Sequence, residues 1–355
     1  MSGTSGDGID CCVVDFSLKV PQIRATHFVK FNSEMKKKVF SITEVSEQSV
    51  NQLALIENEI TKEFAQATNV LLEQASLDAS SISAIGCHGQ TVAHNPRGGY
   101  SLQLVNGALL AELTGITTVI DFRNTDIASG GEGAPLAPAF HDYVFRSEHI
   151  HRVIVNIGGM ANLTNLAPNY PTTGFDTGPG NILLDQMAIK YLNKPFDQDG
   201  SWARSGRVDN EFLRNLEEHP FFNKTPPKSC GKQEFNLSWA EAVASPGIKP
   251  NDIQATFLQL TVNSILKSIK MHCGSAEKIY MCGGGALNKH LMEKLADREP
   301  RGLIGKTDEL GIEAEWVEAM AFAWLAQKAV DKKPIDFSRI TGSRNSRILG
   351  AVYFR

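Results

Sequence analysis

The fold is decided by residues 153–164, which read Val153-Ile154-Val155-Asn156-Ile157-Gly158-Gly159-Met160-Ala161-Asn162-Leu163-Thr164. Apolar, β-branched residues on both sides of paired glycines predict a strand, a tight turn and a second strand. The opening string Gly3-Thr4-Ser5-Gly6-Asp7-Gly8 also precedes an extended, apolar segment and so echoes this pattern. We therefore predict a duplicated fold.

The rest of the chain alternates strands with helices. The expected strands are Cys11–Phe16, Ile23–Phe31, Ile82–Gln90, Tyr100–Leu104, Thr117–Phe122, Lys278–Cys282 and Ile348–Phe354, and the expected helices are Val45–Gln74, Ala108–Leu113, Ile182–Leu192, Asp252–Met271, Lys289–Asp297 and Glu313–Val330. A length of 355 residues suits two α/β domains, since one domain takes roughly 150 residues. We predict an α/β protein with a first lobe of residues 1–130 plus 335–355, a second lobe of residues 131–334, and a ligand cleft between them.

Composition and charge exclude several classes of protein. The net charge of −4 is spread without a basic block, so no nucleic-acid partner is expected. Six cysteines without a CxxC pair indicate reduced thiols. No apolar stretch approaches the ~20 residues that span a bilayer, and no secretory signal opens the chain. We expect a cytoplasmic protein that has no membrane partner, and the oligomeric state is left open, with a homodimer among the options.

The opening glycine string has the composition of a phosphate-binding loop. Glycines let backbone amides approach phosphate oxygens, hydroxyl groups add donors, and Asp7 could hold a hydrated Mg²⁺ ion. The string lacks the closing Gly-Lys-Ser or Gly-Lys-Thr of a Walker A loop. The alternative is a terminal tag of small residues without a function.

A second glycine segment carries a candidate catalytic carboxylate. In Gly174-Phe175-Asp176-Thr177-Gly178-Pro179-Gly180-Asn181, a strand is expected to lead into a Gly-Pro-Gly turn that opens a helix. The glycines Gly178 and Gly180 would leave amide groups available to phosphate at the start of the helix. Asp176 would then lie beside a phosphate, in the position of a general base. The alternative is that Asp176 caps the helix.

Two further sets of residues complete the candidate site. Gly283, Gly284 and Gly285 follow a strand and would let adenosine lie flat against the backbone, although such turns are routine in α/β proteins. Polar residues after other strands would line a sugar pocket: His88, Gln90, Thr91 and Arg123, whose planar fork matches a carboxylate. Their alternative role is to organise loops through hydrogen bonds. Glu318 is a further candidate, and complementing a helix dipole is its alternative role.

With these segments in order, the sequence resembles the anhydro-N-acetylmuramic acid kinases, a branch of the actin, hexokinase and heat-shock-70 ATPase superfamily. The matching strings are Gly3–Asp10, His88–Thr91, Asp121–Arg123, Gly130–Leu136, Asn156–Gly159, Phe175–Asn181 and Gly283–Ala286, and they span essentially the whole chain. The resemblance implies two ribonuclease-H-like lobes of the actin and hexokinase type that flank an active-site cleft.

The resemblance also implies a reaction and residue roles. ATP, with Mg²⁺, would phosphorylate O6 of anhydro-N-acetylmuramic acid while water opens the 1,6-anhydro bond, giving N-acetylmuramic acid 6-phosphate in peptidoglycan recycling. Asp176 would deprotonate that water, Arg123 would bind the lactyl carboxylate, and Glu318 would contact the sugar. The ATP contacts would come from Gly3, Thr4, Ser5, Gly6, Asp7, Gly8, Ile9, Asp10, Asn156, Gly158, Gly159, Gly178, Gly180 and Gly283–Gly285.

The sequence departs from the family at its start, and other functions stay open. Family members usually have a strand ahead of the first glycine loop, whereas here Met1 and Ser2 lead directly into Gly3, and Gly6 replaces a larger apolar residue. We therefore expect the first lobe to lack that strand. The alternatives are another small-sugar or carboxylate kinase, in which Asp176 deprotonates a substrate hydroxyl, an ATP-driven clamp without enzymatic activity, or a glycosidase with two carboxylates.

Overall fold

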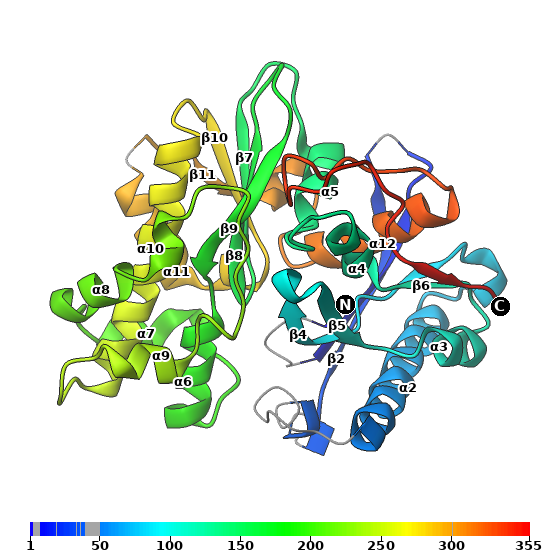
Figure 1. The fold of residues 1–355 in the computed structure, drawn as a ribbon, viewed down its shortest axis with the longest axis horizontal. Helices are drawn as coiled ribbons and strands as arrows, with labels where there is room; N and C mark the ends of the chain where they lie inside the picture. The colour runs from blue at the N-terminus through cyan, green and yellow to red at the C-terminus, as the bar shows by residue number, and fades with distance from the viewer. Residues whose placement is uncertain (3–7, 19, 33, 36, 40–49, 300) are drawn as a thin grey trace. The chain divides into compact units, whose positions relative to one another are not determined.

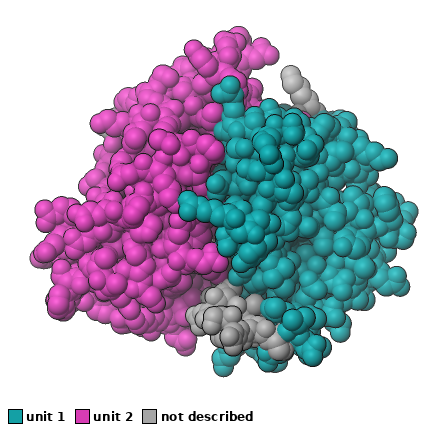
Figure 2. All heavy atoms as spheres, in the orientation of Figure 1, with its two compact units in different colours: residues 1–140, 318–355 teal, residues 141–317 magenta. Residues whose placement is uncertain are grey.

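The computed structural model describes residues 1–2, 8–18, 20–32, 34–35, 37–39, 50–299 and 301–355. These residues group into two units, residues 1–140 with 318–355 (unit 1) and residues 141–317 (unit 2), which Figure 2 shows in teal and magenta. Both units combine helices with sheets, so the predicted α/β class is confirmed. The opening residues Gly3–Asp7, which carry most of the predicted phosphate loop, lie outside the described residues.

Unit 2 is built on one five-stranded sheet (Figure 1). Its strands are β7 (Arg152–Ile157), β8 (Met160–Leu166), β9 (Thr173–Pro179), β10 (Lys278–Cys282) and β11 (Ile304–Lys306), in the spatial order β11-β10-β7-β8-β9. The strands β7, β8 and β9 form an antiparallel meander, and β10 and β11 run parallel to β7. This is the order of a ribonuclease-H-like lobe, and the central β7 and β8 confirm the predicted strand, glycine turn and strand.

The helices of unit 2 cover this sheet. They are α6 (Ile182–Leu192), α7 (Ser201–Ser205), α8 (Asn210–Glu217), α9 (Leu237–Ala242), α10 (Pro250–His272) and α11 (Lys289–Arg298), and α5 (Ala137–Phe145) leads into the unit. Helix α10 begins with a proline, whose fixed φ suits the first turn, and packs against β8 and β9. Phe257, Leu260 and Ile265 are buried along it.

Unit 1 divides its strands among three small sheets. The first is the pair β1 (Gly8–Asp15) and β2 (Gln22–Lys30), and the second is the pair β4 (Gln90–Asn95) and β5 (Tyr100–Leu104). The third has three strands in the order β12-β6-β3, namely β12 (Ala351–Tyr353), β6 (Thr118–Ile120) and β3 (Ile85–Gly86). The main helices of unit 1 are α2 (Val50–Gln74), α3 (Gly107–Thr114), α4 (Phe122–Ala128) and α12 (Val317–Val330). Short 3-10 turns cover Ala79–Ser81, Pro96–Gly98, Gln198–Gly200, Pro220–Asn223, Gly284–Leu287 and Thr307–Leu310 in the two units.

The core of unit 1 lies between α2 and the strands. Ile60, Phe64 and Leu71 recur along α2 at helical spacings, four and seven residues apart, and are buried. The predicted start of this helix at Val45 falls outside the described residues. None of the helices in the described ranges is long and apolar enough to cross a bilayer.

The two units divide the chain differently from the predicted lobes, because α12 belongs to unit 1. Phe322 of α12 packs on the rings of His88 and Phe122, with centroids 4.6 and 5.5 Å apart. A Cβ on Gly86 would lie 2.0 Å from the Phe322 carbonyl oxygen, so only glycine allows the helix so close to β3. The helix also begins at Val317 and not at the predicted Glu313, since Trp316 closes a separate turn onto Glu313.

Candidate active site

Asp176 lies inside β9 and is 4% exposed. It stands opposite Asn162 of β8, at a point where the pairing shifts so that Thr177 is an extra residue. Such β-bulges redirect side chains and are common beside active sites. The segment predicted as a Gly-Pro-Gly turn is therefore the end of a strand, which runs through Pro179.

A segment from elsewhere in unit 2 fixes the Asp176 carboxylate. The backbone N–H of Cys230 donates to Asp176 Oδ2 at 2.9 Å, and the N–H of Asp176 donates to the Lys228 carbonyl oxygen at 3.1 Å. A buried carboxylate needs such partners, because burial without hydrogen bonds is costly. These two bonds orient Asp176 from a segment that sequence reasoning did not connect with it.

The Lys228 side chain is buried beside this segment, at 7% exposure. Its ammonium donates to the Phe221 carbonyl oxygen at 3.3 Å and lies 4.5 Å from the centre of the Phe221 ring. Burial lowers the pKa of Lys228, while the nearby Cys230 and Asp176 oppose that shift. A cation therefore lies near the candidate base.

Asp176 does not cap helix α6, which was its alternative role. The cap position is Asn181, without a side-chain capping bond. The amides at the start of α6 are not available to a phosphate as predicted, because those of Gly180, Asn181 and Ile182 donate to the carbonyl oxygens of Gly158 and Gly159 at 2.9, 2.9 and 3.1 Å. The Gly158–Gly159 turn thus holds the start of the helix against the sheet.

The glycine run after β10 has two kinds of position. A Cβ on Gly283, whose φ is +78°, would lie 2.3 Å from Asn156 Oδ1, and a Cβ on Gly285 would lie 2.3 Å from Ile157 Cγ2. These two glycines let the backbone pack against the end of β7. Gly284 has no atom within 4 Å of its Cβ position, so it faces open space where a flat ligand could lie.

In unit 1, His88 and Arg123 form a hydrogen-bonded pair. The Nε and Nη2 groups of Arg123 donate to His88 Nε2 at 3.2 and 2.9 Å, and His88 Nδ1 lies 3.0 Å from the Gly89 carbonyl oxygen. Burial and the Arg123 charge lower the pKa of His88 well below its usual value. His88 is therefore neutral, with its proton on Nδ1.

A glycine loop holds the other side of Arg123. Nη1 of Arg123 donates to the Gly133 carbonyl oxygen at 2.8 Å, and Asp126 Oδ2 accepts from the Gly133 N–H at 2.8 Å. Asp126 Oδ1 also accepts from the Thr341 hydroxyl at 2.8 Å, and a Cβ on Gly131 would lie 2.2 Å from this carboxylate. The loop therefore wraps around Asp126 and fixes the Arg123 guanidinium.

The remaining predicted sugar residues lie in the same unit. Gln90 is fully buried and its Oε1 accepts from the Ser2 hydroxyl at 2.7 Å, and Thr91 Oγ1 accepts from Gln103 at 3.2 Å. Glu318 lies in the first turn of α12. Burial raises its pKa, and the Arg123 charge opposes that shift. Its place as an acidic residue in the first turn also suits the alternative role of complementing the helix dipole.

The described end of the first glycine string belongs to a strand. Gly8, Ile9 and Asp10 open β1, where a Cβ on Gly8 would lie 2.4 Å from the Val29 carbonyl oxygen and Ile9 is fully buried. Packing accounts for Gly8 and Ile9, and their phosphate contact stays a prediction. Gly3, Thr4, Ser5, Gly6 and the predicted metal ligand Asp7 lie outside the described residues.

Sequence reasoning missed Asn162 and the segment Lys228–Cys230. Asn162 is 8% exposed, and its Oδ1 has no hydrogen-bond partner in the described part of the chain. A signal was present, since Asn162 is a polar residue within a mostly apolar strand. No spacing could connect Lys228–Cys230 with Asp176, because the contact forms across 54 residues. Among the described residues, no group of three or more His, Cys, Asp or Glu side chains could hold a metal ion.

Comparison with known proteins gives consistent matches along the chain. The family model described as anhydro-N-acetylmuramic acid kinase matches residues 1–355. A protein of that name from Nitrosomonas europaea is 45% identical over 99% of this chain and 98% of its own length, and one from Nitrosospira multiformis is 41% identical over 99% and 97%. Among solved structures, the activator of the 2-hydroxyisocaproyl-CoA dehydratase from Clostridium difficile matches with a TM-score of 0.44 and 15% identity over 88% of each chain.

Proposed function

The chain belongs to the anhydro-N-acetylmuramic acid kinase family, and we propose that it hydrolyses the 1,6-anhydro bond of anhydro-N-acetylmuramic acid and phosphorylates O6 with ATP. The product is N-acetylmuramic acid 6-phosphate, which places the enzyme in peptidoglycan recycling. Since the reaction consumes ATP, we also propose a cytoplasmic location. A homodimer stays a prediction.

One observation supports this proposal most strongly: the buried carboxylate of Asp176, which caps no helix and is oriented by the Cys230 amide. A carboxylate in a fixed orientation is suited to general-base catalysis. Asp176 accepts a proton from water, the water oxygen bonds to C1, and the C1–O6 bond breaks. O6 then takes the γ-phosphoryl group of ATP, and ADP leaves.

Asn162 is suited to holding that water. Its side chain lies opposite Asp176 in the pairing of β8 with β9, and directly opposed residues have neighbouring side chains. Its buried Oδ1 lacks a partner among the described residues and can accept a hydrogen bond from water. We therefore assign Asn162 to positioning the nucleophile.

The residues of unit 1 are assigned to the sugar. Arg123 is held by His88 and Gly133, which fixes its charge and orientation for the lactyl carboxylate. Because His88 is neutral, it adds no second positive charge beside Arg123. Thr91 and Glu318 are proposed sugar contacts, whereas Gln90 is proposed to act through Ser2, whose hydroxyl it binds.

ATP is assigned to the glycine-rich turns that follow β7 and β10, and Mg²⁺ to a carboxylate near the start of the chain. Gly284 offers backbone with open space beside it, which fits a nucleotide. Gly158, whose Cβ position lies 3.6 Å from the Met160 carbonyl oxygen, and Asn156, which is buried at the end of β7, are further proposed contacts. Mg²⁺ usually binds through one or two carboxylates and the substrate phosphates. Asp7 is the proposed carboxylate, and the ion would offset the charge of the triphosphate.

The direct test is to mix the purified protein, ATP, Mg²⁺ and the anhydro sugar and to search for a sugar 6-phosphate by mass spectrometry. A product heavier than the substrate by one water and one phosphoryl group is expected. Faster phosphorylation of an open-ring sugar or of acetate would favour another kinase activity. Ring opening that does not depend on ATP would favour a glycosidase.

A further inference from the structure

Unit 2 holds a buried ammonium group beside the proposed base. Lys228 is 7% exposed, and its ammonium donates to the Phe221 carbonyl oxygen at 3.3 Å. Two buried aromatic rings hold the same charge, because its Nζ atom lies 4.5 Å from the centre of the Phe221 ring and 5.8 Å from that of Phe175. Such cation–π contacts are stronger away from water, so they fix the end of the Lys228 side chain.

The backbone of Lys228 is tied to the strand that carries Asp176. The Lys228 carbonyl oxygen accepts from the Asp176 N–H at 3.1 Å, and two residues later the Cys230 N–H donates to Asp176 Oδ2 at 2.9 Å. Lys228 is therefore anchored at both ends, by its side chain to Phe221 and by its backbone to β9. A displacement of its side chain would displace the segment that orients the carboxylate.

The Lys228 ammonium lies on the side of β9 that faces α10. Phe175, whose ring it contacts, packs edge-on against His272 at the end of α10, with ring centroids 4.8 Å apart. Neighbouring residues of a strand point to opposite faces, so Asp176 projects to the other side of β9. The ammonium can thus act on the carboxylate through its charge without occupying the space in front of it.

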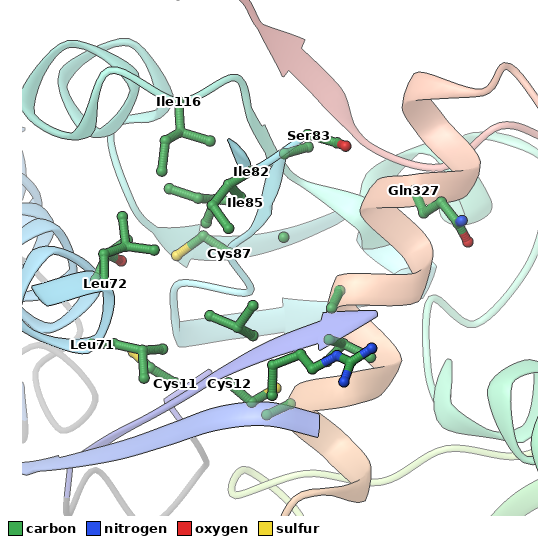
Figure 3. Close-up of a pocket in the computed structure, with 18 of the residues that line it drawn as sticks. Cys11, Cys12, Leu71, Leu72, Ile82, Ser83, Ile85, Cys87, Ile116 and Gln327 are labelled. Atoms are coloured by element: carbon green, nitrogen blue, oxygen red, sulfur yellow. The ribbon is translucent and has the colours of Figure 1, made fainter. Parts of the chain in front are cut away.

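Asp176 is the anion that compensates this buried cation. Burial lowers the pKa of Lys228, and among the described residues the negative groups that oppose the shift are Cys230 and Asp176. Burial and then the Asp176 charge raise the pKa of Cys230 well above its usual value, so Cys230 is an uncharged thiol at neutral pH. Burial likewise raises the pKa of Cys12 to about 12 and of Cys87 to about 11 in unit 1, where both line a cavity of about 760 Å³ (Figure 3). The negative charge near Lys228 is therefore that of Asp176.

The other titratable groups that the structure places around Lys228 do not take over this role. Two of them are cations that lower the pKa of Lys228 further, and a histidine is uncharged at neutral pH because burial and the Lys228 charge lower its pKa. A carboxylate near Cys230 is paired with one of the two cations at 3.2 Å. The groups concerned are Lys267 and His272 of α10, Lys224, and Glu234, which pairs with Lys224.

We propose that Lys228 is a positioning residue for the reaction: its charge keeps Asp176 ionised, and its anchored side chain holds the segment that orients this carboxylate. The assignment rests on Asp176 as the proposed base. Burial disfavours the charged form of a carboxyl group, and Asp176 is 4% exposed, so a cation is needed to hold it as a carboxylate. A protonated Asp176 cannot accept a proton from water. The Lys228 charge therefore extends activity to lower pH.

The test compares the pH dependence of kcat/KM for the anhydro sugar in the native enzyme and in variants of Lys228. Lys228→Met keeps most of the length of the side chain, and Lys228→Gln keeps a donor for the Phe221 carbonyl oxygen, but both lose the charge. Both are expected to move the acidic limb of the profile to higher pH by about one unit or more. Titrations of ATP and of the sugar are the same in every variant, so they cannot produce this difference.

Two controls should keep the native limb. Lys228→Arg retains the charge and can still lie against the rings. Lys224→Met removes an exposed lysine whose Nζ lies 5.5 Å from the centre of the same Phe221 ring. A purely structural role of Lys228 would lower kcat/KM by the same factor at every pH and leave the limb in place, and that result in the two uncharged variants would overturn the proposal.

A second measurement does not depend on activity. The ¹³C signal of the Asp176 carboxyl, assigned by its absence in Asp176→Asn, should titrate at higher pH in Lys228→Met. The shift should persist when His272→Gln is added, since His272 is another group whose pKa the Lys228 charge lowers. An unshifted carboxyl signal would overturn the proposal. A native enzyme that forms no sugar 6-phosphate would instead refute the proposed function, and the carboxyl titration would still decide whether Lys228 acts on Asp176.

Discussion

The backbone N–H of Cys230 donates a hydrogen bond of 2.9 Å to the Oδ2 atom of Asp176, 54 residues earlier in the chain. The same segment accepts from the Asp176 N–H through the Lys228 carbonyl oxygen. Both contacts are made by backbone, so the orientation of the carboxylate depends on the path of residues 228–230 and not on one side chain. This gives the candidate base a fixed position within β9.

Alanine substitutions of the glycines after β10 should show which glycine is needed for packing and which for ligand binding. Gly283→Ala should lower the free energy of unfolding by about 1–3 kcal/mol, because its Cβ would overlap Asn156 Oδ1 and its φ is +78°. Gly284→Ala, the matched control, should change it by less than about 0.5 kcal/mol, since its Cβ meets no atom within 4 Å. Urea unfolding measures both.

The same pair tests the proposed adenosine contact. If nucleotide lies over Gly284, Gly284→Ala should raise the KM for ATP while Tm stays unchanged. An unchanged KM for ATP would remove Gly284 from the nucleotide site.

Arg123→Lys should raise the KM for the anhydro sugar about tenfold or more and lower kcat much less. Lysine keeps the charge but loses the planar fork, and a hydrogen bond to a charged group contributes about 1.5–3 kcal/mol. Steady-state kinetics with varied sugar gives both constants. Arg97→Lys, a change at an exposed arginine, is the matched control. A normal KM in Arg123→Lys would place the sugar carboxylate elsewhere.

Stability should fall with acid because of His141. This histidine is fully buried, and burial lowers its pKa from 6.5 to about 3. Below pH 6.5 the unfolded chain binds a proton at His141 that the folded chain does not bind until pH about 3, so the free energy of unfolding falls as the pH drops through this window. The slope from one such group is about 1.4 kcal/mol per pH unit.

Urea unfolding at pH 7, 6 and 5 measures this effect. His141→Gln should lose less stability than the native chain on going to pH 5, whereas His149→Gln, at an exposed histidine, should follow the native chain. Parallel curves for the native chain and His141→Gln would contradict the assignment. Above pH 6.5, His141 is neutral in both states and contributes no slope.

Nucleotide binding should require Mg²⁺. A triphosphate beside the carboxylates of Asp7 and Asp10 needs its charge offset. Calorimetry should therefore show a much weaker affinity for ATP when a chelator is present. Equal affinities with and without the chelator would contradict a metal-dependent site.

Helices and strands with a clear hydrophobic pattern in their own residues could be predicted from the sequence. Tyr100–Leu104, Ile182–Leu192 and Lys278–Cys282 have the predicted bounds, because each is a short periodic run between turn residues. The predicted strand Ile82–Gln90 was too long, since the chain leaves β3 after Gly86 and Gly89 adopts a φ of +72°. The assignment of α12 to unit 1 depends on its contact with Gly86, and the hydrophobic periodicity of the sequence cannot reveal such a contact.

The candidate site was predictable where a residue carries its own chemical signal. Asp176 and Arg123 stand out in glycine-rich or strand-end segments. The amides of Gly180–Ile182 looked available in the sequence, but the Gly158–Gly159 turn binds them. Gln90 looked like a ligand residue but is buried against Ser2. Such contacts arise only when distant segments pack together.

The most direct test of the proposed reaction is the turnover of Asp176→Asn. Asparagine keeps the shape of the side chain, and its Oδ1 can still accept the Cys230 N–H, so fold and ligand binding should be preserved. It cannot accept the proton of the attacking water, and loss of a general base typically costs ~10²- to 10⁴-fold in rate.

The variant and the native enzyme are compared for kcat and for Tm, and a short reaction in oxygen-18 water, with unlabelled product as the exchange control, locates the water oxygen. The account predicts a normal Tm, a kcat reduced by at least about a hundredfold, and label at C1 of the native product but not in its phosphate. A variant that kept more than about a tenth of the native kcat, or label in the phosphate, would contradict Asp176 as the base that activates water.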